Sequence, residues 1–146
     1  MDGSYRIEDG IDSELIIQLL EDRIYHHNSR AIYKDDGCLF SRIVRDKSKD
    51  VIAGIAGWTW ASVCEITQLW VNEKIRKKGL GKLLLEAAEA VAKNKGCHTI
   101  LVKSYSFQAP GFYEKHGYRI EHVLNGFPQG HNYYTLIKKI DRQFSK

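Results

Sequence analysis

The chain has 146 residues, of which 43% are hydrophobic and 27% charged, and its formal net charge is +4. This length fits one domain, here residues 1–146, and the composition is that of a folded globular protein rather than a disordered one. No apolar run reaches the roughly 18–20 residues that a membrane-spanning helix needs, and the first residues do not resemble a secretory signal, so we expect a cytoplasmic protein that does not contact membranes.

In chain order, the first half predicts a strand, a helix and three more strands. Tyr5–Glu8 is expected to be a short strand, and Asp12 or Ser13 can cap a helix that runs to about His27. Residues 46–50 form a polar turn. The strands that follow from alternating or β-branched residues are Gly37–Arg45, Val51–Trp60 and Val63–Val71.

Strict alternation along residues 63–71 assigns its side chains to two faces. Glu65, Thr67, Leu69 and Val71 are expected on one face, with Ile66, Gln68 and Trp70 on the other. Trp58 and Trp60 also share a strand face, where they are expected either to pack in the fold or to form an aromatic wall for a substrate.

The second half predicts two helices and three strands. Apolar residues from Leu80 to Ala92 recur at helical spacing, so a helix is expected to end near Lys95, followed by Gly96. The remaining elements are a strand at His98–Tyr105, a short helix at Pro110–His116 stopped by Gly117, and strands at Tyr118–Leu124 and Asn132–Ile140. This order indicates one mixed α/β domain.

A basic, glycine-containing segment lies between a predicted strand and the start of a helix. It reads Arg76-Lys77-Lys78-Gly79-Leu80-Gly81, and five of the six charged residues between positions 72 and 82 are basic. Free N–H groups and the helix dipole make such a helix start an anion site, and glycine lets a backbone approach a phosphate closely. Leu84 excludes the dinucleotide fingerprint GxGxxG, while Arg76 and Leu83 exclude the P-loop.

The segment RKKGLG, preceded by QLWV, resembles the acyl-CoA pyrophosphate loop of the GNAT (Gcn5-related) N-acetyltransferase superfamily, [QR]-x-x-G-x-[GA]. A second resemblance lies in FQAPGFYEKHGY, residues 107–118, which is similar to A-x-x-F-Y-x-x-x-G-[FY] of the same superfamily. The resemblance covers roughly Val51 to Ile140. It implies a mostly antiparallel, twisted sheet that is splayed between its fourth and fifth strands and flanked by helices.

The resemblance also implies how acetyl-CoA is bound, without any metal. The main chain of Leu69 and Val71 would pair with the pantetheine arm, and the Val71 amide would polarise the thioester carbonyl. Gln108 would contact the pantetheine, and Arg76 and Lys82 would add positive charge. The amides expected around the pyrophosphate are those of Lys77, Lys78, Gly79, Leu80 and Gly81.

The implied reaction is direct acyl transfer to a primary amine, which must lose a proton before it attacks. Tyr113 lies where the superfamily keeps a tyrosine that protonates the leaving thiolate, although it can also be a packing aromatic. Glu65 is placed similarly to the glutamate base of histone-acetylating members, or it simply faces solvent. The acceptor is expected to be a small-molecule amine or a lysine-containing chain, and similar proteins form homodimers.

Several alternatives remain beside this function. The chain can instead be a protein or peptide amine acyltransferase, or a non-catalytic acyl-CoA-binding regulator. A nucleic-acid patch on RKKGLGK is disfavoured because the basic charge is confined to one loop. The cysteines Cys38, Cys64 and Cys97 form no CxxC or CxxH pair, so we expect buried reduced thiols rather than zinc ligands.

Overall fold

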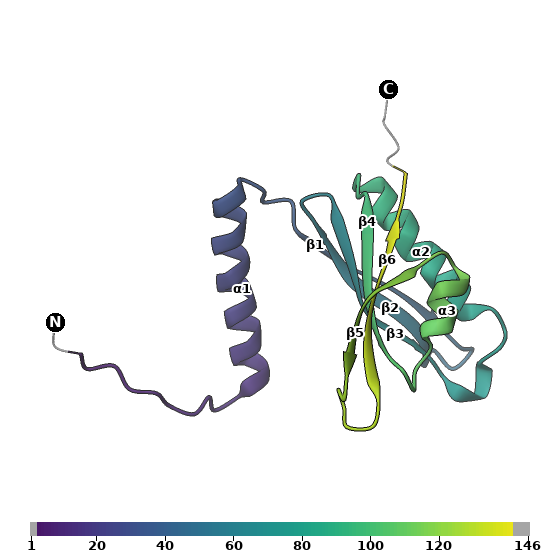
Figure 1. The fold of residues 1–146 in the computed structure, drawn as a ribbon, viewed down its shortest axis with the longest axis horizontal. Coiled ribbons are helices and arrows are strands. Elements are labelled where there is room, and N and C mark those ends of the chain that lie inside the picture. The colour runs from purple at the N-terminus through teal and green to yellow at the C-terminus, as the bar shows by residue number, and fades with distance from the viewer. Residues whose placement is uncertain (1–2, 142–146) are drawn as a thin grey trace. The chain divides into compact units, whose positions relative to one another are not determined.

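The computed structural model describes residues 3–141, which divide into two compact units at Asp35 and Asp36. The second unit is built on a six-stranded sheet with the strand order β1-β2-β3-β4-β6-β5 (Figure 1). Its helices α2 and α3 contact the strands of this sheet. The mixed α/β fold expected from the order of the elements is therefore confirmed.

The first unit contains the helix α1, Ser13–Ile32. The Asp12 carboxylate accepts a hydrogen bond from the Leu15 amide (3.3 Å), which confirms the predicted N-cap. The helix runs past its predicted end near His27 and stops at Ile32, where Tyr33 takes a left-handed conformation and its amide donates to the Ser29 carbonyl oxygen. The strand predicted at Tyr5–Glu8 is wrong: these residues are not in a strand, since within residues 3–141 no strand pairs with them.

The strands of the second unit agree with the predicted segments to within a residue or two at each end. All neighbouring pairs in the sheet are antiparallel except β3 and β4, which are parallel. The bounds are β1 Cys38–Arg45, β2 Val51–Trp60, β3 Val63–Val71, β4 Thr99–Tyr105, β5 Arg119–Asn125 and β6 Asn132–Lys139.

The parallel pair is short. The register of β3 with β4 runs from Val63 and Thr99 only to Ile66 and Val102. Beyond that point β3 continues to Val71 and β4 to Tyr105 without pairing with each other, so the two strands diverge at their C-terminal ends. This is the splay expected between the fourth and fifth strands of the sequence prediction, which are β3 and β4 here.

A β-bulge in β3 overturns the predicted faces of this strand. Ala56 of β2 pairs with Gln68 and Gly57 pairs with Ile66, so Thr67 is an extra residue. The bulge returns Leu69 and Val71 to the core face that Cys64 and Ile66 occupy, and Glu65 lies on the opposite face. The expectation that Glu65 shares a face with Val71 is wrong, because strict alternation holds only up to the bulge.

Three helices follow β3 and β4: the short η1 (Glu73–Ile75), α2 (Leu80–Asn94) and α3 (Pro110–Lys115). Gly96 and Gly117 follow α2 and α3 with φ of +73° and +93°, as expected for residues that end a helix. The buried side chains of α2 are Leu84, Leu85, Ala88 and Ala92.

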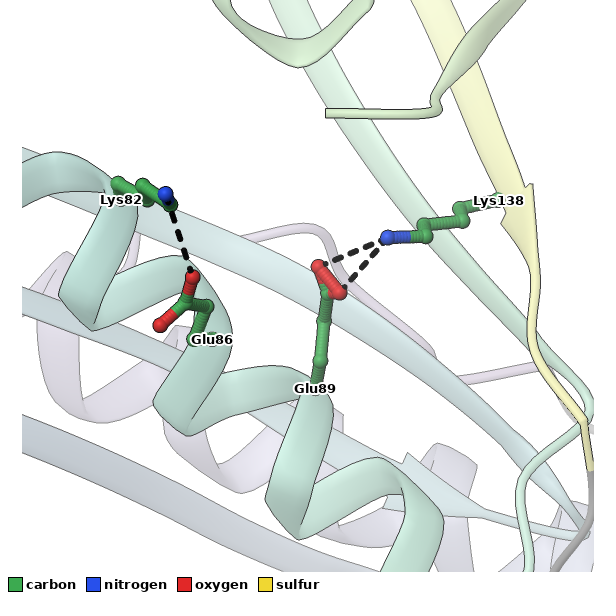
Figure 2. Close-up of polar contacts among 4 residues, drawn as sticks. All are labelled: Lys82, Glu86, Glu89 and Lys138. Carbon is green, nitrogen blue, oxygen red and sulfur yellow. Dashed lines mark hydrogen bonds and ion pairs between the residues drawn. The ribbon is translucent and has the colours of Figure 1, made fainter. Parts of the chain in front are cut away.

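An ion pair fastens α2 to β6. The Lys138 ammonium donates to both oxygens of the Glu89 carboxylate at 2.9 and 3.1 Å (Figure 2). Both side chains are largely buried, with 27% and 13% exposed. The second pair in Figure 2, Lys82 with Glu86 at 4.0 Å, lies within α2 and is more than half exposed.

Candidate active site

The glycine-containing loop leads from β3 through η1 into the first turn of α2. Gly79 is the N-cap of α2 with φ +80°, and a Cβ at this position would have no neighbour within 4 Å. Because glycine has no side chain, it leaves the first amides of α2 without a side-chain cap. Lys77 also has a positive φ, of 68°. The loop therefore presents amides and positive charge at one helix start, as an anion site requires.

Side chains around this loop hold it to the end of β3. The Arg76 Nε donates to the Val71 carbonyl oxygen at 3.0 Å, and the Asn72 Oδ1 accepts from the Lys74 amide at 3.0 Å. Arg76 therefore acts on the backbone of the strand, in addition to any charge it offers to a ligand. Lys82 points along α2 to Glu86.

The open edge of β3 lies beside this loop. Leu69 and Val71 pair with Ile55 and Ala53 of β2, while their register with β4 has ended at Ile66. A main-chain edge of this kind can accept an extended ligand as an added strand. Across the gap, the Gln108 Oε1 accepts from the amide of Tyr105 at 2.7 Å, which closes the turn after β4.

Tyr113, on α3, lies on the core side of the sheet. Its side chain is 7% exposed, and its ring packs edge-on against Phe112 at 5.3 Å and Tyr118 at 5.7 Å. Burial raises the pKa of Tyr113 to about 12. The phenol is therefore neutral and able to donate a proton or a hydrogen bond throughout the physiological pH range. Phe112 also lies at 3.4 Å from the position of a Cβ on Gly81, so α3 and the start of α2 are neighbours.

Tyr118 is a buried tyrosine whose role the sequence did not indicate beyond its place in the motif. Its hydroxyl has no hydrogen-bond partner in the part of the chain that the structure describes. Burial, and then the carboxylate of Glu89, raise the pKa of Tyr118 well above its usual value. The Lys138 ammonium lies 5.5 Å from the centre of its ring. Tyr118, just before β5, meets Glu89 of α2 and Lys138 of β6 only through the tertiary fold, which the sequence does not show.

Glu65 lies on the opposite face of the sheet from Tyr113's core environment. Its carboxylate is 3.9 Å from the Lys103 ammonium, and its partner across β2 is Trp58. The structure therefore does not bring the two predicted catalytic side chains together on one face. Glu65 lies one residue before the β3–β4 register ends, and Tyr113 belongs to the core on the other side of the sheet.

The cysteines and histidines form no evident ligand cluster. Cys64 and Cys97 are buried as expected, but Cys38 is exposed, because it begins β1 at the edge of the sheet. Burial raises the pKa of Cys64 to about 12, so this thiol is unreactive at neutral pH. Across residues 3–141, no group of three or more His, Cys, Asp or Glu side chains is arranged to hold a metal ion. None of the helices in this range is both long and apolar enough to cross a membrane.

The comparisons with known proteins point to one family. A model of the acetyltransferase (GNAT) family matches residues 6–118. A blasticidin-S acetyltransferase of Streptomyces morookaense is 37% identical over 90 residues, which are 61% of this chain and 64% of that protein. An N-acetyltransferase of Chlorobaculum tepidum is 39% identical over 67 residues, which are 46% of this chain and 41% of that protein. The matched part of this chain thus spans less than two thirds of the length of either relative.

Solved structures have the same fold. An acetyltransferase from Bacillus cereus superposes with a TM-score of 0.77 at 33% identity, covering 93% of this chain and 98% of that one. The PaiA N-acetyltransferase of Thermoplasma acidophilum, in complex with coenzyme A, has a TM-score of 0.60 at 22% identity, covering 70% and 61%. The fold of this chain is thus one that these proteins share.

Proposed function

The chain belongs to the acetyltransferase (GNAT) family, and we propose that it transfers the acetyl group of acetyl-CoA to a primary amine. The observation that carries this proposal is the juxtaposition of the unpaired edge of β3 with the capless start of α2. A pantetheine arm and a pyrophosphate need these two features side by side. We treat residues 1–146 as one catalytic domain, since the family match spans both compact units.

The residues present fit an acyl-CoA. Leu69 and Val71 offer main-chain groups to the pantetheine arm, with the Val71 amide directed to the thioester carbonyl, and Gln108 lies at the turn across the gap. Lys82 and Arg76 flank the phosphate site. That the PaiA structure is a coenzyme A complex supports the same ligand here. The pyrophosphate site is assigned to the amides of Lys77, Lys78, Gly79, Leu80 and Gly81.

The two faces of the sheet suit the two proton transfers. An amine that approaches from the Glu65 face would attack the thioester carbonyl, while the sulfur would leave towards the face of Tyr113. Glu65, directly or through water, would take the proton from the amine. Tyr113, neutral because burial raises its pKa to about 12, would donate to the departing thiolate.

The acceptor is proposed to be a small-molecule amine. The similarity to a blasticidin-S acetyltransferase supports this class over a protein lysine. A protein or peptide acyltransferase and a non-catalytic acyl-CoA-binding regulator are the alternatives. A homodimer and a cytoplasmic location stay predictions.

The first test is calorimetric titration of acetyl-CoA into the wild-type chain and two variants. Gly79→Asp puts a carboxylate at the proposed pyrophosphate site. Gly96→Asp is the matched control, because Gly96 also has a positive φ and an open Cβ position but lies at the other end of α2. We expect micromolar binding that Gly79→Asp abolishes and Gly96→Asp retains.

Free-thiol release with blasticidin S and simple primary amines then tests catalysis. Turnover of a small amine confirms the acceptor class, and turnover of a lysine peptide alone favours the protein acyltransferase. Binding without turnover of any acceptor favours the regulator. Absence of binding at millimolar acetyl-CoA contradicts the site itself.

A further inference from the structure

Four aromatic rings gather where β4 ends and β6 begins. They belong to Tyr105, Phe107, Phe127 and Tyr133, and we refer to them as the aromatic surface. Tyr105 and Phe107 are stacked with centroids 5.2 Å apart and planes at 4°. Tyr133 lies 4.3 Å from Tyr105 and 5.4 Å from Phe127. The rings therefore form one connected cluster rather than separate surface residues.

Hydrogen bonds of the main chain hold the cluster in place. The Ser106 amide donates to the Asn132 carbonyl oxygen at 2.8 Å, and the Asn132 amide donates to the Ser106 hydroxyl at 3.1 Å. The Gly126 amide donates to the His131 carbonyl oxygen at 2.8 Å, which closes the turn that carries Phe127. The aromatic surface is thus built on an ordered frame, as a preformed binding site is.

The aromatic surface lies on the same face of the sheet as Glu65, where the amine is proposed to bind. Phe107 and Phe127, which both stack with Tyr105, are 58% and 49% exposed. In the register of the sheet, Tyr105 pairs with Tyr133, and Tyr105 lies two residues beyond Lys103, the partner of Glu65. Two residues along a strand place Tyr105 roughly 6.6 Å from Lys103, on the face where the base Glu65 lies.

The geometry of the aromatic surface suits a flat ring, because its members already contact one another in stacked and tilted arrangements. The Glu65 carboxylate on this face is paired with the Lys103 ammonium at 3.9 Å. The His131 ring lies edge-on to Phe107, with the ring centroids 5.0 Å apart. Aromatic rings attract another ring through offset stacking or edge contacts.

We propose that the aromatic surface binds an aromatic or heteroaromatic ring of the acceptor, so that the enzyme prefers amines that carry such a ring a few bonds from the nitrogen. This inference rests on the proposed function, because it extends the same site. Because Tyr105 follows Lys103 by two residues on the same face of β4, a ring on the aromatic surface and an amine beside Glu65 would be a few bonds apart. The ring determines which amine binds, and the chemistry of transfer is unchanged.

The test compares 3-phenylpropylamine with 3-cyclohexylpropylamine, which differ in the aromaticity of one ring. We expect a KM for the phenyl amine that is lower by about 2- to 10-fold, the range of one aromatic pair. Phe107→Leu and Phe127→Leu should remove most of this difference and leave the KM of acetyl-CoA unchanged. Leu83→Ala changes an apolar residue of α2 that is 60% exposed, and it should leave the KM values of both amines and of acetyl-CoA unchanged.

The outcomes separate this inference from the function on which it rests. Equal KM values for the two amines, or a difference that survives both phenylalanine variants, would overturn the aromatic surface alone. Acetyl-CoA that neither binds nor is turned over would overturn the proposed function and this inference with it. Unfolding temperatures of Phe107→Leu and Phe127→Leu within about 2 °C of the wild type should show that these substitutions leave the fold intact.

Discussion

The sharpest test of the proposed mechanism is Tyr113→Phe, because this change removes one hydroxyl and leaves the packing in place. The edge-on contacts with Phe112 and Tyr118 involve the ring, which phenylalanine keeps. We therefore expect a loss of stability of at most about 1.5 kcal/mol, the net contribution of one hydrogen bond of a hydroxyl. The affinity for acetyl-CoA should also stay the same, since no phosphate or pantetheine contact is assigned to the hydroxyl.

The expected loss of rate is modest, and the pKa of Tyr113 explains why. A phenol with a pKa of about 12 is a far weaker acid than a thiol with a pKa of about 8.5, so complete proton transfer to the thiolate is uphill by a factor of a thousand or more. Tyr113 can therefore help chiefly by a hydrogen bond to the developing thiolate. A general acid contributes about 10²–10⁴-fold when its pKa is well matched, so we expect a loss of kcat near 10-fold here.

The assay is steady-state thiol release at saturating acetyl-CoA, with Tyr118→Phe as the matched control. Tyr118 has the same residue type in the same cluster, but its hydroxyl has no partner among the described residues. Tyr118→Phe should keep kcat and raise the free energy of unfolding by about 1 kcal/mol, because an unpaired buried hydroxyl is costly. Equal rates for Tyr113→Phe and the wild type would refute the acid role of Tyr113, and so would equal losses in both variants.

Three further changes probe the fold beneath the site. Gly57→Ala should lower the free energy of unfolding, measured by chemical denaturation, by about 2 kcal/mol or more. The added Cβ would overlap the Glu65 carbonyl oxygen and lie 2.9 Å from the Phe40 ring. Gly54→Ala is the control and should cost far less, because the nearest atoms there lie at 3.4 Å. Lys138→Met leaves Glu89 unpaired and should cost about 1–3 kcal/mol, whereas Lys82→Met, which breaks a largely exposed pair, should cost at most about 0.5 kcal/mol. The free energy of unfolding should also fall as the pH rises from 10 to 12, because the unfolded tyrosine ionises near pH 10 while folded Tyr113 keeps its proton to about pH 12. This fall should be smaller in Tyr113→Phe. An equal fall in the variant and the wild type would contradict the raised pKa of Tyr113.

The helix α2 and the loop before it could be predicted because local chemistry determines both. The apolar period from Leu80 to Ala92 has one helical solution, and Gly96 marks its end in sequence and structure alike. The positive φ of Gly79 likewise depends on the residue itself. The residues within such an element determine its conformation, so the sequence alone predicts it.

The bulge at Thr67 could not be predicted, because it depends on a neighbouring strand. Nothing in VCEITQLWV shows that one residue of β3 is skipped, and the cause lies partly in β2, where only glycine at position 57 allows the close approach of the Glu65 carbonyl. The missing strand at Tyr5–Glu8 has a related cause. A short apolar segment becomes a strand only when another strand supplies its hydrogen bonds.

The bulge also separates two kinds of recognition within one site. Acetyl-CoA is proposed to bind main-chain groups of β3 and α2. Its binding therefore depends on the glycine positions and on the pairing register of β3, and the glycine positions can be recognised as a sequence motif. The acceptor is proposed to meet side chains such as Tyr105 and Phe127 on the other face, where ordinary strand and turn residues serve. Substitutions there can therefore change the preferred amine without disturbing the cofactor site. For that reason the variants of the aromatic surface should alter the KM of the amine while that of acetyl-CoA stays constant.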